Sequence, residues 1–472
     1  MPSRFSACLF LTTLISLTAF SLPVTSSQEQ EQTNGTATPE RDLLERVYNP
    51  SIIASTPYFK IFNGTAAIAG GGYIVGIVSG SGIYAVIHGN ESHPNAPRLI
   101  HYSERPVAVA EIKPPDKPYV SERLLITLKT LLTTSITHLL EFNDRNGDSL
   151  FSIRQSGAMG PPFIPDEPEK LLNLSRSNWQ SRVSGMTVNN DSALFNITVT
   201  AQDVPYTREW MRSGAGNDSV DEIKFTIAFN FTLSDTSAPN IPIFEFIGGE
   251  VKLKRTISEV VKVKNLECST KYSVKITGWD FTDSEGLIYL MTGITLSEMV
   301  EVKGLPSVPP LLAKNTGLRP EIQYSTLEGQ KNASYDFPKN DEVVHKIQGK
   351  LLDIRNSQGR LGYFGWKGNY TVDGTTKETV VQLDGFFRRE DSGIARSGLR
   401  SFSTLVVTGG FIYAAGNTIE HDPELKSISF FFQQEPHIIP PAVRETLLNN
   451  SLILFAATTA FLVAFVIWLK RH

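Results

Sequence analysis

Strict alternation of apolar and polar residues is the feature that most restricts how this chain can fold. Between residues 223 and 233 the odd positions are all apolar, namely Ile223, Phe225, Ile227, Phe229, Phe231 and Leu233. A period of two places such residues on one face of a β-strand. The same pattern recurs at 195–199 and 272–276. We therefore expect a mainly β structure, an antiparallel sandwich or prism-like stack in one or two lobes.

The N-terminus has the layout of a secretory signal peptide. Arg4 precedes an apolar run from Ala7 to Leu22, which Pro23 and a series of small residues follow. The small residues favour cleavage after Ser26, and the run is short for a bilayer span, so a retained anchor is the weaker alternative. The sequence predicts a signal peptide at residues 1–26.

The C-terminus resembles a membrane anchor. The stretch from Ser451 to Leu469 carries no charge and is followed by Lys470 and Arg471. A stretch of this length spans the hydrocarbon core as a helix and contacts membrane lipid, and the basic end favours the cytoplasmic side. We predict a transmembrane helix at 451–469, a cytoplasmic tail at 470–472 and a type I single-pass topology.

The remaining chain divides at its Pro- and Gly-rich segments. A flexible polar leader is expected at 27–45 and a β-rich ectodomain lobe at 46–303. A Pro/Gly-rich linker at 304–320 then separates a second β lobe at 321–435, and a stalk at 436–450 precedes the membrane helix.

Glycosylation motifs are frequent. Asn-X-Ser/Thr occurs well above the frequency that chance predicts, and Asn449 lies too close to the predicted membrane helix to be modified. The usable sequons are at Asn34, Asn63, Asn90, Asn173, Asn190, Asn196, Asn217, Asn230, Asn332 and Asn369. The sequence thus predicts a glycosylated surface. None lies between Asn230 and Asn332, so the strands within Val251–Leu296 are expected either to face a protein or to be interior.

Cysteine and charge content exclude some classes. Cys8 is lost with the signal peptide, so Cys268 alone remains and no intrachain disulfide can form. We expect Cys268 to be a buried small apolar residue. The net charge of -4 provides no basic surface for a nucleic acid partner, and 41% hydrophobic residues exclude global disorder.

One segment resembles the start of a calcium loop. Asp144, Asn146 and Asp148 place oxygen ligands at alternate positions, which a hard cation requires. Gln155 stands where a bidentate Glu is expected. The alternative is a plain hairpin that turns at Asn146 and Gly147, between strands at 139–142 and 150–153. Calcium is the only cofactor that the sequence indicates, and no catalytic residue is predicted.

Three glycines at Gly72, Gly76 and Gly80 lie in an apolar segment that admits three interpretations. A dinucleotide-binding turn needs a helix after Gly82, and the segment offers none. A second membrane span across 66–87 would place sequons on both sides of the bilayer. A hairpin that turns between Ser79 and Gly82 is favoured.

Several segments together resemble the family of glycosylated lysosomal membrane proteins. They are Thr137–Asp144, Ser177–Trp179, Phe195–Val199, Leu266–Ile276 and Leu287–Thr295, in a chain with the same order of signal peptide, glycosylated β domain and anchor. The resemblance implies a non-enzymatic accessory glycoprotein, in that family a dimerising partner that protects a multi-span transporter. The chain lacks the family's several cysteines and its tyrosine-based sorting tail, which favours the cell surface over the lysosome.

The leading hypothesis is therefore a non-catalytic membrane glycoprotein that acts as accessory or binding partner of another membrane or envelope protein, with a homodimer also open. A calcium-dependent adhesion or surface-layer component is the alternative. An extracytoplasmic hydrolase without a local motif comes third, because catalytic groups can converge from distant strands.

Overall fold

The computed structural model describes most of the β-rich part of the chain. The described residues are 47–66, 72–80, 82–89, 93–112, 122–145, 147–151, 166–206, 219–237, 241–247, 250–257, 262–302, 321–326, 329–333, 345–346, 351–356, 359–395 and 398–433.

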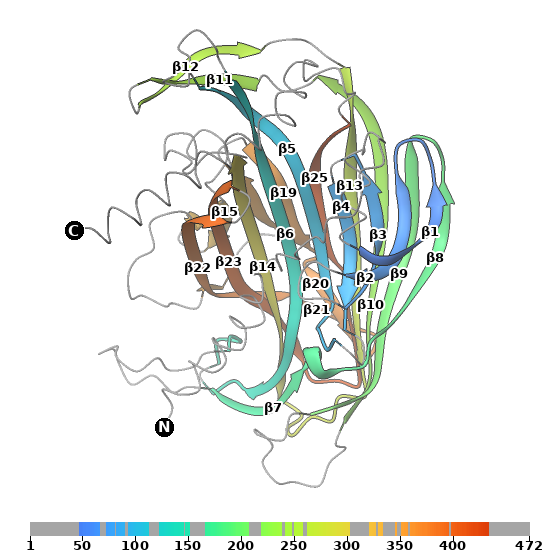
Figure 1. Cartoon of the computed structure of the whole chain (residues 1–472). Coiled ribbons are helices and arrows are strands. Elements are labelled where there is room, and N and C mark those ends of the chain that lie inside the picture. Colours follow the sequence, from blue (N-terminus) through green and yellow to red (C-terminus); the bar gives the residue numbers. More distant parts are fainter. Residues whose placement is uncertain are drawn as a thin grey trace, which may run out of the picture.

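Two large sheets make up the fold (Figure 1). The first sheet runs in the order β1 (Val47–Ser55), β2 (Lys60–Ala66), β3 (Tyr73–Ser79), β4 (Gly82–His88), β5 (Arg98–Ile112), β6 (Glu122–Asn143), β14 (Leu287–Val302), β23 (Gly398–Ala414), β22 (Val380–Ala395) and β17 (His345–Lys346). β7 (Glu167–Asn173) pairs with β6, and β11 (Ile241–Ile247) joins β5 to β12 (Glu250–Ile257).

The second sheet faces the first one. Its order is β16 (Gly329–Ala333), β15 (Glu321–Thr326), β18 (Leu351–Asn356), β19 (Gly359–Trp366), β25 (Pro423–Gln433), β13 (Lys262–Thr277), β10 (Ser219–Ser237), β9 (Ser192–Pro205) and β8 (Gln180–Val188). Three short strands, β20 (Asn369–Val372), β21 (Thr375–Glu378) and β24 (Thr418–His421), attach to β13 through β24. A short 3-10 helix, Leu174–Arg176, follows β7.

The predicted alternation forms the core between the sheets. All the odd positions of β10 from Ile223 to Leu233 are buried and belong to one large apolar cluster, as predicted. The even positions, such as Asn230, point to the outer face. Cys268 is free and buried on the neighbouring strand β13, as expected.

Aromatic rings connect the two sheets through this core. Phe231 on β10 stacks on Phe229 and Phe195, with ring centroids 5.6 and 5.9 Å away. On its other side it meets the ring of Tyr84 on β4 edge-on at 5.4 Å, and Tyr84 stacks on His101 of β5 at 4.2 Å. Rings of this size account for a large share of the buried area that holds a sandwich together.

The two predicted lobes form one sandwich. β14, before the predicted linker 304–320, pairs with β23 after it, and β13 pairs in the same way with β25. Strands from both ranges also contribute to one core cluster. The Pro/Gly-rich segment itself lies outside the described residues. Strands on both sides of this segment suggest a lobe boundary, but the local composition gives no information about strand pairing across it.

Among the described strands, antiparallel pairing prevails, as expected, with one exception. Ile243 of β11 lies opposite Val109 of β5 in a parallel register. β11 and β12 therefore extend the first sheet beside the end of β5, at the top of Figure 1.

The glycine-rich segment forms the favoured hairpin. β3 and β4 pair in register, with Ser79 opposite Gly82, and Gly80 takes a positive φ of 51° in the turn. Gly76 lies where the backbones approach closely, because a Cβ there would come within 2.1 Å of the carbonyl oxygen of Tyr84. The glycines thus serve a turn and a close strand contact rather than a nucleotide or a membrane helix.

Among the described residues, no helix combines the length and apolar character that crossing a membrane requires. The predicted signal peptide, leader, stalk, transmembrane helix and tail lie outside the described residues.

Candidate functional site

The predicted calcium loop is a tight turn that backbone groups already hold. The two carboxylate oxygens of Asp144 accept hydrogen bonds from the amides of Gly147 and Ser149, both at 2.8 Å. Asp148 accepts one from the amide of Leu150 at 2.7 Å. Asn146 lies outside the described residues. Among those described, no three His, Cys, Asp or Glu side chains gather in a way that could hold a metal ion.

The alternative hairpin at this turn does not form. Leu150 and Phe151 leave β6 and pack on the outer face of the first sheet, against Phe142 and Tyr289. The backbone of Phe151 exchanges two hydrogen bonds of 2.7 Å with the side-chain amide of Gln382 on β22. The reason is that β7 already occupies the edge of β6 that a hairpin partner would need.

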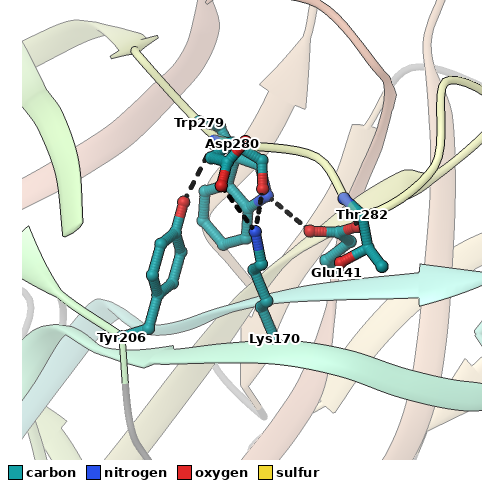
Figure 2. A network of polar contacts seen from close by, with 6 residues as sticks. All are labelled: Glu141, Lys170, Tyr206, Trp279, Asp280 and Thr282. Atoms are coloured by element: carbon teal, nitrogen blue, oxygen red, sulfur yellow. Dashed lines mark hydrogen bonds and ion pairs between the residues drawn. The ribbon is translucent and has the colours of Figure 1, made fainter. Parts of the chain in front are cut away.

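A buried polar network lies at the end of the sandwich where β6 and β9 end and β7 begins (Figure 2). Its centre is Glu141, which is only 1% exposed and faces inward like Leu139 two residues before it. The Glu141 carboxylate accepts hydrogen bonds from the indole Nε1 of Trp279 at 2.8 Å and from the amide of Thr282 at 2.6 Å. Both donors belong to the connection that crosses from β13 to β14.

Lys170 on β7 reaches the same connection. Its ammonium donates to the backbone carbonyl of Asp280 and lies 3.3 Å from the Asp280 carboxylate. The hydroxyl of Tyr206, at the end of β9, accepts a hydrogen bond from the amide of Asp280 at 3.1 Å, and the Lys170 ammonium lies 5.0 Å from the centre of the Tyr206 ring. The second sheet contributes Tyr206 and the first sheet contributes Glu141 and Lys170, so the network joins the two sheets.

Burial controls the acid–base behaviour of these groups. It raises the pKa of Glu141, while the hydrogen bonds from Trp279 and Thr282 and the charge of Lys170 act in the opposite direction. It also raises the pKa of Tyr206, assisted by the charge of Asp280. A buried carboxyl with a raised pKa beside an amine is a feature of functional sites, but structural ion pairs show it too.

One small cavity lies between the sheets, and none of the network residues lines it. It has a volume of about 20 Å³ and is lined by apolar side chains including Phe364, Trp366, Val407 and Phe411. That is about the room of one water molecule. This cavity does not accommodate an organic substrate.

The described sequons all lie at the surface. The side chains of Asn63, Asn173, Asn190, Asn196, Asn230 and Asn369 are half-buried or exposed. Those of Asn34, Asn90, Asn217 and Asn332 are outside the described set. Asn196 on β9 and Asn230 on β10 point from the outer face of the second sheet, so glycans at these sites would cover that face.

The strands within Val251–Leu296, expected either to face a protein or to be interior, differ from one another in the structure. β14 lies in the middle of the first sheet between β6 and β23, so it is an interior strand. On β13, Lys275 is half-buried and forms an ion pair of 2.9 Å with Glu420. Yet Asn230 lies opposite Ser269 of the same strand, so β13 shares its outer face with a sequon. Spacing along the sequence did not reveal this because neighbouring strands place distant residues side by side.

A different surface is apolar and open. β1 is the edge strand of the first sheet, at the right of Figure 1 beside the sequon-bearing strands. Tyr48, Ile52 and Ile53 are 51%, 44% and 40% exposed. They make up half of the described large apolar residues that are exposed, the others being Leu194, Leu253 and Leu351. β1 contains no charged residue.

Sequence reasoning missed both the network and the edge. Glu141 had a usable signal, because it shares the parity of the apolar Leu139 on a strand and so had to be buried. No sequence signal marked Lys170, Tyr206 and Asp280, since only the fold brings them together.

No protein-family model matches the chain, and no curated protein matches it either.

Proposed function

We propose that this protein is a non-catalytic type I membrane glycoprotein that binds another membrane or envelope protein, and that the partner adds an extended segment to the free edge of β1. The observation that carries the proposal is the exposure of Tyr48, Ile52 and Ile53 on an uncharged edge strand. Natural sheets usually protect such edges with charged residues, and an open apolar edge invites another strand.

The usable part of this edge is short. Pro50 cannot donate a backbone hydrogen bond, and the pairing of β1 with β2 shifts register between Tyr48 and Ser51 and again between Ile52 and Ala54. These features prevent unlimited sheet growth. Strand addition at such an edge takes its affinity from backbone hydrogen bonds and its specificity from alternate side chains.

Two further observations support the proposed setting. The sequons on the outer face of the second sheet would keep that face free of protein contacts, because a glycan blocks close packing. Burial lowers the pKa of His101 to about 3 and of His138 to about 4, so these two side chains lower the stability of the fold at acidic pH. A cell-surface location fits this better than an acidic compartment.

The test is to place charge on the edge. Ile52→Lys combined with Ile53→Lys should abolish co-purification of the partner protein from native membranes, because a partner strand would then have to bury two ammonium groups. Stability should change by less than about 0.5 kcal/mol, since both side chains are exposed. The readout is affinity purification of the full chain followed by mass spectrometry, with urea unfolding as the folding check.

Leu253→Lys is the matched control, because Leu253 is 61% exposed on β12, away from the edge. It should retain the partner. If the edge variant retains every partner that the control retains, β1 is not the binding surface. If partner loss is equal in both variants, the effect is not specific to β1 and the proposal is likewise contradicted.

A further inference from the structure

The buried network contains the components of a covalent cross-link. An amine and a carboxyl group are in contact at Lys170 and Asp280, and a buried carboxyl, Glu141, is near enough to feel the charge of Lys170 (Figure 2). Trp279 and Tyr206 border the same place, and each is only 4% exposed. Amine, carboxyl and proton carrier therefore lie together beside two buried aromatic rings.

The geometry restrains both reacting side chains. The Lys170 ammonium binds the backbone carbonyl of Asp280 and lies 3.3 Å from an oxygen of its carboxylate. The hydroxyl of Tyr206 holds the amide of Asp280 at 3.1 Å. The lysine side chain is 11% exposed and that of the aspartate 34%. Groups fixed in contact react as if at very high concentration, which favours condensation over the free pair.

We propose that Lys170 and Asp280 condense to an intramolecular isopeptide bond, with Glu141 as the proton-transferring group. The bond joins Nζ of Lys170 to Cγ of Asp280 and releases one water molecule. It needs no oxidant, metal or cofactor.

Each proton in the step has a place. Transfer of one proton from the Lys170 ammonium to the Asp280 carboxylate gives a neutral amine and a neutral acid. The Nζ lone pair attacks Cγ, and the carboxyl proton of Glu141 passes to the departing hydroxyl group. The nitrogen returns a proton to Glu141, so Glu141 is regenerated and water leaves. Burial raises the pKa of Glu141, which keeps the proton available.

A cross-link at this place has a structural purpose in this chain. Cys268 is the one cysteine left after the predicted signal cleavage, so a disulfide cannot tie the sandwich together. Lys170 and Asp280 are 110 residues apart in sequence and join β7 of the first sheet to the connection that leaves β13 of the second. Closing so long a loop restricts the unfolded chain strongly.

The experiment is a tryptic map of the full-length chain after removal of N-glycans. Trypsin cuts after Arg154 and Lys275, so the cross-link should appear as residues 155–176 joined to residues 276–303, with the mass of one water missing. Cleavage after Lys170 should be absent from that species. Fragmentation should locate the junction at Lys170 and Asp280.

Two variants separate a cross-link from an ion pair. Lys170→Arg preserves the positive charge but cannot condense. Glu141→Gln preserves size and one of the two oxygens that accept from Trp279 and Thr282, but cannot shuttle the proton. Both should give separate, linear peptides. An ion pair alone would make no difference to the peptide masses of the unmutated chain.

Linear peptides of full mass from the unmutated protein would overturn the proposal, whether or not the variants fold. A dehydrated but linear 276–303 peptide would overturn it too, because it would indicate a cyclised Asp280 instead. A cross-link that persists fully in Glu141→Gln would contradict the role of Glu141.

Discussion

Lowering the pH from about 7 to about 5 is expected to reduce the free energy of unfolding through three buried histidines, each by about 2 kcal/mol. Burial lowers the pKa of His101 to about 3, and that of His138 and His421 to about 4. Below about pH 6.5 the unfolded chain binds protons at these positions while the folded chain does not, so stability falls as the pH falls.

His421 shows why the folded protein resists protonation. Its Nδ1 lies 2.9 Å from the hydroxyl of Tyr413, and its Nε2 lies 3.1 Å from the backbone carbonyl of Lys367. The carbonyl can only accept, so Nε2 carries the proton and Nδ1 accepts from Tyr413. A second proton on Nδ1 would reverse that hydrogen bond, and it would place a positive charge in a buried site that the ring of Phe411 also encloses at 4.9 Å.

Two buried acidic side chains have the opposite effect on the pH dependence of stability. Burial raises the pKa of Glu141 and of Asp384, so these groups bind protons more readily in the folded protein and add stability as the pH falls through their folded pKa values. The histidine contribution must therefore be isolated by a variant rather than read from one curve.

The measurement is urea unfolding between about pH 7 and about pH 5 for the unmutated protein and for His101→Phe. Phenylalanine retains the stacking on Tyr84, whose ring centroid is 4.2 Å from that of His101. The loss of stability across this pH interval should be smaller in the variant by about 2 kcal/mol. Equal pH dependence in the two proteins would show that His101 is not neutral and buried as described.

Phe231→Ala is expected to lower the free energy of unfolding by about 3–5 kcal/mol, the range for removing a buried aromatic side chain. Phe231 is fully buried and is the ring of β10 that meets Tyr84 of the opposite sheet. Removing it leaves a cavity where the two sheets contact, and the sequon at Asn230 is preserved because its Thr232 remains.

Thr226→Ala is the control for this substitution. Thr226 lies on the same strand but on the outer face, where it is half-buried. Its loss should change stability by less than about 1 kcal/mol, measured by the same urea titration. Similar effects at both positions would contradict the assignment of inner and outer faces on β10.

The class of fold and the core of the second sheet were predictable because they depend on local alternation. A strand with one buried face has apolar residues at every second position, and the odd positions from Ile223 to Leu233 follow this pattern without exception. The hairpin of β3 and β4 was equally local, since Ser79 and Gly82 are close in the chain.

The arrangement of strands and the buried network were not predictable, because they depend on contacts between distant residues. Nothing in the composition of 304–320 shows that β14 would pair with β23 across it. The spacing of Asp144 and Asp148 in the sequence fits a cation site. In the structure, however, both carboxylates accept hydrogen bonds from backbone amides of the turn. Glu141 meets Trp279, and Lys170 meets Asp280, because a connection crosses between the sheets, and such a crossing has no local signature.

The most direct test of the proposed function is photo-cross-linking from the edge strand. A benzophenone amino acid replaces Tyr48 in one variant and Leu253 in another, and the full chain is irradiated in native membranes. The proposal predicts a covalent adduct with a second, different membrane or envelope protein from position 48 and none from position 253. An adduct of two copies of this chain would assign the edge to a homodimer, and no adduct at position 48 would contradict binding at β1 altogether.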